Sequence, residues 1–250
     1  MQVGRGVHLV SLIKTTKCKC TAMASSDQLK SLPSQRKLIW ENYNEQKTQH
    51  WPARGRHILA HYDDEGIVVY QAFNKAIAEY AVKFQRFGGP AYRFERMSWI
   101  KTNFMWMMYR CGWASKPNQE HVLAIRISQA AFEDILSKAL TMEKQKEQSV
   151  SADKLQVRLQ WDPDHNPQGG PAASRRAIQL GLKGQILKEF SETSILNIMD
   201  ITEQVREQRQ VLDTQGEDAI VSPRERIYLP ASQDTARQIG LDDFSDEQKE

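Results

Sequence analysis

The residues best suited to chemistry gather between positions 86 and 126. This stretch holds seven basic residues against two acidic ones, together with eight of the chain's aromatic side chains. Arginine and lysine bind phosphate groups, and an indole ring can stack on a planar base. The stretch therefore predicts a site for a nucleotide-like or otherwise phosphorylated ligand.

Helical spacing would bring part of this stretch onto one face. We expect a helix over residues 99–111, with Ser98 as its N-cap and Gly112 as its C-terminal stop. At that spacing one face alternates cations and indoles, namely Arg96, Trp99, Asn103, Trp106, Arg110 and Trp113. Such a face binds an anionic ligand, or it is structural, with arginine stems packed on indoles and their heads in water. Both interpretations stay open.

Under the ligand-binding interpretation, each residue type has a role. Guanidinium and ammonium groups suit phosphate oxygens, so the cations are expected to hold the anion. Trp99 or Trp106 would stack on a planar group of the ligand. The predicted ligand-binding residues are Arg56, Gln71, Arg93, Arg96, Trp99, Lys101, Trp106 and Arg110.

Proton transfer at such a site needs a titratable side chain, and three are candidates: His57, Tyr70 and Glu120. His57 and Tyr70 flank the first predicted strand, and Glu120 precedes a later one. A structural histidine at position 57 and a plain surface residue at position 120 are the open alternatives. No metal site is predicted, because the acidic clusters at 62–65 and 162–165 are typical of turns.

The chain lacks the sequence motifs of three well-known classes of protein. The chain contains no G-x-x-x-x-G-K and no G-x-G-x-x-G, so P-loop and Rossmann nucleotide sites have no support. It also contains no G-x-S-x-G, the turn that carries the nucleophile of many serine hydrolases. Any nucleotide site must therefore be built differently.

The elements that would position these residues alternate irregularly. Strands are predicted over residues 67–70, 122–127, 155–161, 176–182 and 195–201, and a long turn over 162–171. Helices are predicted over residues 35–47, 74–87, 99–111, 130–146, 184–190 and 202–212. The order shows no regular βαβ repeat, so we expect a single α+β domain with a mostly antiparallel sheet and flanking helices.

Charge divides the chain into three parts: a basic and polar arm (1–53), a globular body (54–212) and an acidic, mobile tail (213–250). The tail carries a net charge of −6 and residues 1–26 carry +4, which leaves +5 for residues 27–212. A basic body favours an anionic partner, although such a charge is common in soluble proteins.

The first 26 residues allow two interpretations. They are basic and free of acidic residues, like a transit peptide, but Met23 followed by small residues also resembles a true start. Mean hydropathy is −0.61, and no apolar run approaches the roughly 18 residues of a membrane helix. Three cysteines exclude a disulfide scaffold. We expect an intracellular, cytoplasmic protein with no membrane partner, and a mitochondrial location is the alternative.

Several short motifs resemble a family catalogued as domain of unknown function 4291. They lie at Arg56–Ala60, Val69–Phe73, Arg96–Lys101, Phe104–Arg110, Gln119–Ile125, Gln160–Pro163 and Arg176–Leu182. The resemblance covers about residues 55–205 and implies no assigned activity. Thr102, Asn103 and Cys111 depart from the residues expected at those positions.

Two classes of function follow as hypotheses. The first is an enzyme acting on a nucleotide-like substrate, because the split set of His57, Arg56 and Glu120 is similar in layout to ADP-ribosyltransferases. NAD or another nucleotide would then be the cofactor. The alternative is a non-enzymatic module that binds RNA or another nucleic acid through the same face. A further possibility is a protein-binding module whose acidic tail, residues 213–250, covers its own basic face. The sequence does not predict the oligomeric state.

Overall fold

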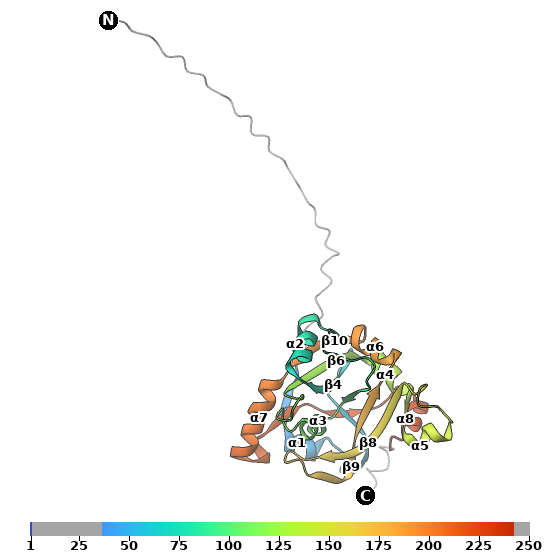
Figure 1. Ribbon diagram of the computed structural model, residues 1–250. Helices are drawn as coiled ribbons and strands as arrows, with labels where there is room; N and C mark the ends of the chain where they lie inside the picture. Colours follow the sequence, from blue (N-terminus) through green and yellow to red (C-terminus); the bar gives the residue numbers. More distant parts are fainter. Residues whose placement is uncertain (2–36, 243–250) are drawn as a thin grey trace. The chain divides into compact units, whose positions relative to one another are not determined.

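The computed structural model describes Met1 and residues 37–242, and the latter all belong to one unit of the chain (Figure 1). Its strands are β1 (Trp40–Asn42), β2 (Gly55–Arg56), β3 (Ile58–Ala60), β4 (Gly66–Phe73), β5 (Ser98–Lys101), β6 (His121–Ser128), β7 (Ala139–Leu140), β8 (Val157–His165), β9 (Pro171–Leu182), β10 (Ile195–Asp200), β11 (Val221–Pro223) and β12 (Arg226–Tyr228). Its helices are α1 (Tyr43–Gln49), α2 (Lys75–Phe84), α3 (Phe104–Cys111), α4 (Gln129–Ser137), α5 (Met142–Glu147), α6 (Gln185–Glu192), α7 (Thr202–Gln215) and α8 (Gln233–Ile239). None of the helices in this part is long and apolar enough to cross a membrane.

An eight-stranded sheet forms the centre of this unit. Its strands follow the order β10-β6-β4-β5-β9-β8-β7, with β2 beside β9. Two pairs, β2 with β9 and β7 with β8, are parallel, and the other pairs in the sheet are antiparallel. This arrangement confirms the predicted α+β class and the mostly antiparallel sheet.

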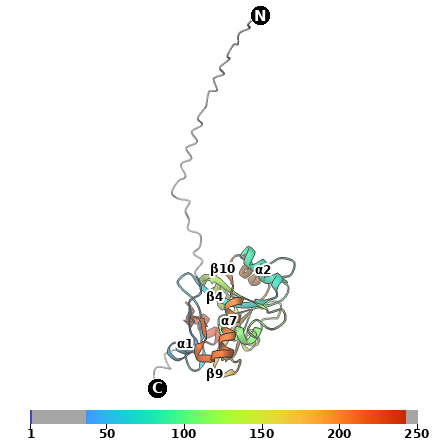
Figure 2. The ribbon, with the colours of Figure 1, turned by 90° about the vertical axis from the view of Figure 1, so that its left-hand side faces the viewer.

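Alternating side chains of the sheet face two separate cores. On β4, Ile67 and Val69 face one core, while Val68 and Tyr70 face the other. Apolar residues of α2, α4 and α6 fill the first core, and those of α1, α3 and α7 fill the second. Figure 2 views the unit from the side on which α7 lies. The sheet is thus covered by helices on both faces.

The sheet is weakly joined in its middle. Strand β4 pairs with β6 along its whole length, but it pairs with β5 only at Tyr70 and Lys101. Helix α3 packs against β4, β5 and β8, and so spans the place where the two halves separate. The opening between β4 and β5 is the feature that positions the site described below.

The helix predicted over residues 99–111 is wrong in its first half. Ser98–Lys101 is strand β5, which pairs with the end of β9, and α3 begins only after Asn103. The side chain of Asn103 accepts a hydrogen bond from the Trp106 N–H (2.7 Å), so Asn103, not Ser98, caps the helix. Sheet pairing therefore overrides the local signal at Ser98, and the predicted face of cations and indoles does not lie on one helix.

Two further boundaries differ from the prediction. The helix expected over 130–146 is divided, because Ala139 and Leu140 form the short strand β7 beside β8. The turn expected over 162–171 is shorter, because β8 continues to His165. Pro163 is tolerated in this strand because β7 pairs with β8 only at Val157 and Arg158, which leaves Pro163 at an edge.

The segment 213–242 is folded, contrary to the mobile tail that we expected. Strand β11 pairs with β1, β12 pairs with β3, and α8 contacts α4. Tyr43 and Trp51 of the predicted arm are buried, so the globular unit begins before residue 54, and β1 and α1 replace the helix expected over 35–47. These short strands escaped prediction because acidic residues surround their few buried side chains. The rest of the expected arm and tail, residues 2–36 and 243–250, lies outside the described residues.

Tyr228 offers a direct test of this folded segment. It is 4% exposed, and its ring packs edge-on against Tyr62 and Phe132 at centroid distances of 5.2 and 5.4 Å. Tyr228→Ala should lower the free energy of unfolding by about 3–5 kcal/mol, because it empties a buried site. The neighbouring control Leu229→Ala changes an exposed side chain and should stay within about 0.5 kcal/mol of the parent. Equal urea midpoints for the two variants would contradict the packing of β12.

Candidate functional site

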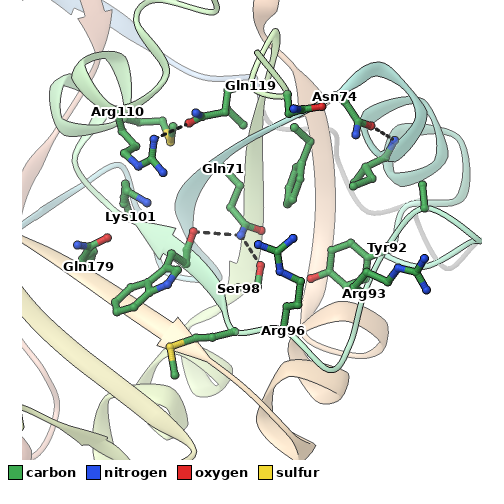
Figure 3. Close-up of a pocket in the computed structure, with 18 of the residues that line it drawn as sticks. Gln71, Asn74, Tyr92, Arg93, Arg96, Ser98, Lys101, Arg110, Gln119 and Gln179 are labelled. Carbon is green, nitrogen blue, oxygen red and sulfur yellow. Dashed lines mark hydrogen bonds between the residues drawn. The ribbon is translucent and has the colours of Figure 1, made fainter. Parts of the chain in front are cut away.

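A pocket of about 760 Å³ opens where β4 and β5 separate (Figure 3). Its walls come from the end of β4 and the start of α2, from the loop before β5, from α3, and from the loop after α3. Strands β5 and β9 contribute to it as well. Segments far apart in the sequence therefore meet at one cavity.

The amide of Gln71 closes the gap between the two strands. It donates hydrogen bonds to the Ser98 hydroxyl (2.7 Å) and to the Trp99 backbone carbonyl (3.0 Å). A carbonyl oxygen only accepts, so the atom beside it must be the amide nitrogen, and the orientation of the amide is fixed. Gln71 is buried and lines the pocket. Its side chain thus replaces the backbone pairing that β4 and β5 lack beyond Tyr70.

Lys101 is the innermost cation of the pocket. Its side chain is 4% exposed, and its Nζ lies 5.2 Å from the ring centroid of Trp106. Within residues 37–242, no hydrogen bond or ion pair involves this ammonium group. The pKa of Lys101 is lowered from 10.5 to about 8, mainly by burial and next by the charge of Arg110, while Asp162 opposes the shift.

Three arginines add positive charge around the same pocket. Arg93 and Arg96 come from the loop before β5, and Arg110 from the last turn of α3, and all three are exposed. Arg110 donates a hydrogen bond to Gln119 Oε1 (3.2 Å), which holds its guanidinium at the pocket (Figure 3). No aspartate or glutamate is among the described residues that line the pocket. The lining therefore carries four basic side chains and no carboxylate.

Two indoles line the pocket in different ways. Trp106 is buried and presents its face to Lys101. Trp99 is half-buried and lies over Gly181, where an added Cβ would come within 3.0 Å of its ring. Gly181 thus leaves the room that the side chains of Met97 and Trp99 occupy. Trp99 is the more accessible of the two rings for a ligand.

Gln179 also lines the pocket. It is the direct neighbour of Lys101 across the β5–β9 pair. Its Nε2 donates to Gln160 Oε1 (2.9 Å) and to Asp162, so both amide hydrogens are used. Burial raises the pKa of Asp162, while the hydrogen bond from Gln179 and the charge of Lys101 oppose the rise. We did not predict Gln179 as a site residue. The sequence did contain a signal for it: Gln179 alternates with the apolar residues Ile178 and Leu180, so its side chain lies on the opposite face of the strand.

The pocket brings together seven of the eight predicted ligand-binding residues, namely Gln71, Arg93, Arg96, Trp99, Lys101, Trp106 and Arg110. The eighth, Arg56, does not line it. Arg56 lies on β2, beside Arg176 of β9, and its backbone N–H donates to Asp242 (2.9 Å). Tyr92 and Gln119 line the pocket and were not predicted as site residues. No motif marks Tyr92, and the family motif that begins at Gln119 implies no activity.

The three predicted catalytic residues do not line the pocket. Tyr70 is fully buried against Phe104, with ring centroids 5.6 Å apart, and burial raises its pKa well above the usual range. His57 is buried and lies between β2 and β3. Glu120 follows the pocket-lining Gln119 and accepts a hydrogen bond from the Asn118 backbone N–H (2.9 Å). Tyr70 directly precedes Gln71 and Glu120 directly follows Gln119, so both are adjacent in the chain to residues of the pocket, whereas His57 is not.

Fold and pocket together define an α+β protein with a central cavity lined by lysine, arginine and tryptophan. A family model described as a domain of unknown function, DUF4291, matches residues 57–228, which is more than half of the chain. The chain belongs to this family. The match continues to the end of β12, beyond residue 205, where the resemblance seen in the sequence motifs ends. No curated protein matches the chain significantly.

The burial of Lys101 has a measurable effect on stability. Its folded-state pKa is about 8, below the unfolded value of 10.5, so the charged lysine opposes folding below pH 8. This penalty disappears as the pH rises from about 8 to 10.5. Lys101→Met keeps most of the volume and should raise the free energy of unfolding by about 2–3 kcal/mol at pH 7.

The matched control is Lys75→Met, which changes an exposed lysine on α2 and should have little effect. Urea denaturation of both variants at pH 7 and pH 10 would measure the difference. A Lys101→Met protein that is less stable than the parent at pH 7 would contradict the assignment of an unpaired, buried charge.

Proposed function

We propose that the protein binds a nucleotide-like or otherwise phosphorylated ligand in the pocket between β4 and β5. The observation that carries the proposal is the buried ammonium of Lys101, which forms no ion pair among the described residues and has three arginines around its pocket. The charge of Asp162 offsets only part of the effect of burial. Removing an ammonium group from water costs several kcal/mol unless an opposite charge compensates it. A ligand anion would supply that charge.

The arrangement assigns parts of the ligand to parts of the pocket. A phosphate within reach of Lys101 would accept hydrogen bonds from its three N–H groups, and the exposed arginines would bind further phosphate oxygens. Trp99, the accessible indole, would stack on a planar group such as a base. A volume of about 760 Å³ is within the range of pockets that bind small organic ligands.

The finer proposal is a group transfer of the ADP-ribosyltransferase type, with NAD as the donor. It is supported by the cation-rich pocket and by Glu120 next to Gln119 at its edge. Glu120 is the candidate for orienting a ribose hydroxyl. His57 and Tyr70 have no role in this version, because both side chains are buried outside the pocket lining, whereas Glu120 is only half-buried.

Isothermal titration calorimetry with pyrophosphate, ATP and NAD tests the binding step. We expect Lys101→Met to weaken binding at least 100-fold, because an anion loses its buried partner. Lys75→Met, whose lysine is exposed next to the pocket wall, should bind like the parent. Affinity should fall as the pH rises through about 8, because Lys101 then loses its charge.

Two outcomes would overturn the proposal. If Lys101→Met binds these anions as tightly as the parent protein does, the pocket is not the anion site. If only a short RNA binds, with an affinity that falls steeply with salt, the protein is a nucleic-acid module that contacts many phosphates.

A further inference from the structure

We propose that Lys101 is also a nucleophile, and that its amine forms an imine with phosphorylated aldehydes or ketones that enter the pocket. This inference rests on the proposed function, since the phosphate would hold the ligand in place. It adds a covalent step and a class of substrate to a site so far described only as an anion site.

The surroundings of Lys101 suit a reactive amine. The side chain is 96% buried, lines the pocket, and is engaged only through the face of Trp106 in the described part of the chain. The titratable groups around it are Arg110 and Cys111 on α3 and Asp162 on β8. Asp162 favours the protonated amine but forms no ion pair with it, and its effect is smaller than that of burial. Desolvation next to another cation is a known way to activate a lysine. With a pKa of about 8, about a fifth of the amine is neutral at pH 7.4, against roughly a thousandth for an ordinary lysine.

The cations of the pocket divide into two groups. Figure 3 shows Arg93 and Arg96 on one side of Gln71, and Lys101 with Arg110 and Gln179 on the other. A ligand whose phosphate is bound by the first pair would extend across Gln71 and bring its other end to Lys101. With such a ligand the two arginines would hold the phosphate while the amine of Lys101 reacts with the carbonyl group at the other end.

Gln179 supplies the hydrogen-bond acceptor that an imine needs. Both hydrogens of its amide are used by Gln160 and Asp162, which leaves its carbonyl oxygen as the group available to Lys101 across the β5–β9 pair. That oxygen can accept the remaining proton of a protonated imine. Gln179 is therefore a positioning residue for the product of the reaction.

The step balances without any other reactant. The neutral amine attacks the carbonyl carbon and a C–N bond forms. The carbonyl oxygen then takes up two protons and leaves as water while the C=N bond forms. Overall, one ammonium group and one carbonyl give one protonated imine and one water, with no change in oxidation state.

Pyridoxal 5′-phosphate, a planar aldehyde with a phosphate group, is a suitable probe for the full chain. We expect borohydride reduction to trap one equivalent of it on Lys101, as located by peptide mass mapping. Half-maximal labelling should need at least ten times less probe than labelling of exposed lysines needs, and pyrophosphate should compete. The labelling rate should rise with a midpoint near pH 8.

Variants separate this inference from the proposed function. Lys101→Arg keeps a positive charge but has no primary amine, so it should lose the trapped equivalent, whereas the control Lys75→Arg should keep it. If pyrophosphate binds the parent but Lys101 is not labelled, the imine is refuted and the anion site stands. If Lys101 reacts equally well with pyridoxal, which lacks the phosphate, the assigned substrate class is wrong. If pyrophosphate does not bind the parent protein, the proposed function fails together with this inference.

Discussion

The single backbone pairing between β4 and β5 determines the rest of the site. Two adjacent strands that pair at only Tyr70 and Lys101 leave their remaining peptide groups to be satisfied in other ways. The side-chain amide of Gln71 bridges the two strands here, because it donates hydrogen bonds to the Ser98 hydroxyl and to the Trp99 carbonyl. A cavity can exist in the middle of the sheet because a side chain bridges the strands where backbone pairing stops.

Helix α3 holds the two halves of the sheet at this opening, and a buried carboxylate anchors its first turn. Glu225 accepts hydrogen bonds from the Phe104 backbone N–H and from the Asn103 amide (3.2 Å). Burial raises the pKa of Glu225 well above its usual range, and the hydrogen bond from Phe104 opposes that rise. The segment after α7 therefore contributes to the site although it does not line the pocket. It fixes the helix that carries Trp106 and Arg110.

The sequence predicted which residues line the pocket better than it predicted the helices and strands that carry them. The concentration of cations and indoles over 86–126 led to six residues of the pocket, and Gln71 was predicted separately from the end of the first strand. The helix assumed for them was wrong, since Ser98 and Asn103 both suit an N-cap and only pairing with β9 decides between them. Arg126, which was counted with the same cluster, instead forms ion pairs with Asp63 and Glu65 (2.5 and 3.3 Å).

Other features depend on contacts between distant segments and could not be read locally. Gln179 and Lys101 are 78 positions apart in the chain and become neighbours only through the β5–β9 register. The folded segment 213–242 is stabilised by pairing with β1 and β3, at the opposite end of the unit's sequence. The family match supplies no activity, so the chemistry of the pocket has to be argued from its charges.

The central claim is that Lys101 carries a buried positive charge, which a bound anion compensates. A direct test is an NMR titration of the Lys101 side chain in isotopically labelled protein, with and without pyrophosphate. The account predicts a midpoint near pH 8 in the free protein and a clear upward shift when pyrophosphate binds. A midpoint near the ordinary lysine value of 10.5, unchanged by pyrophosphate, would contradict it.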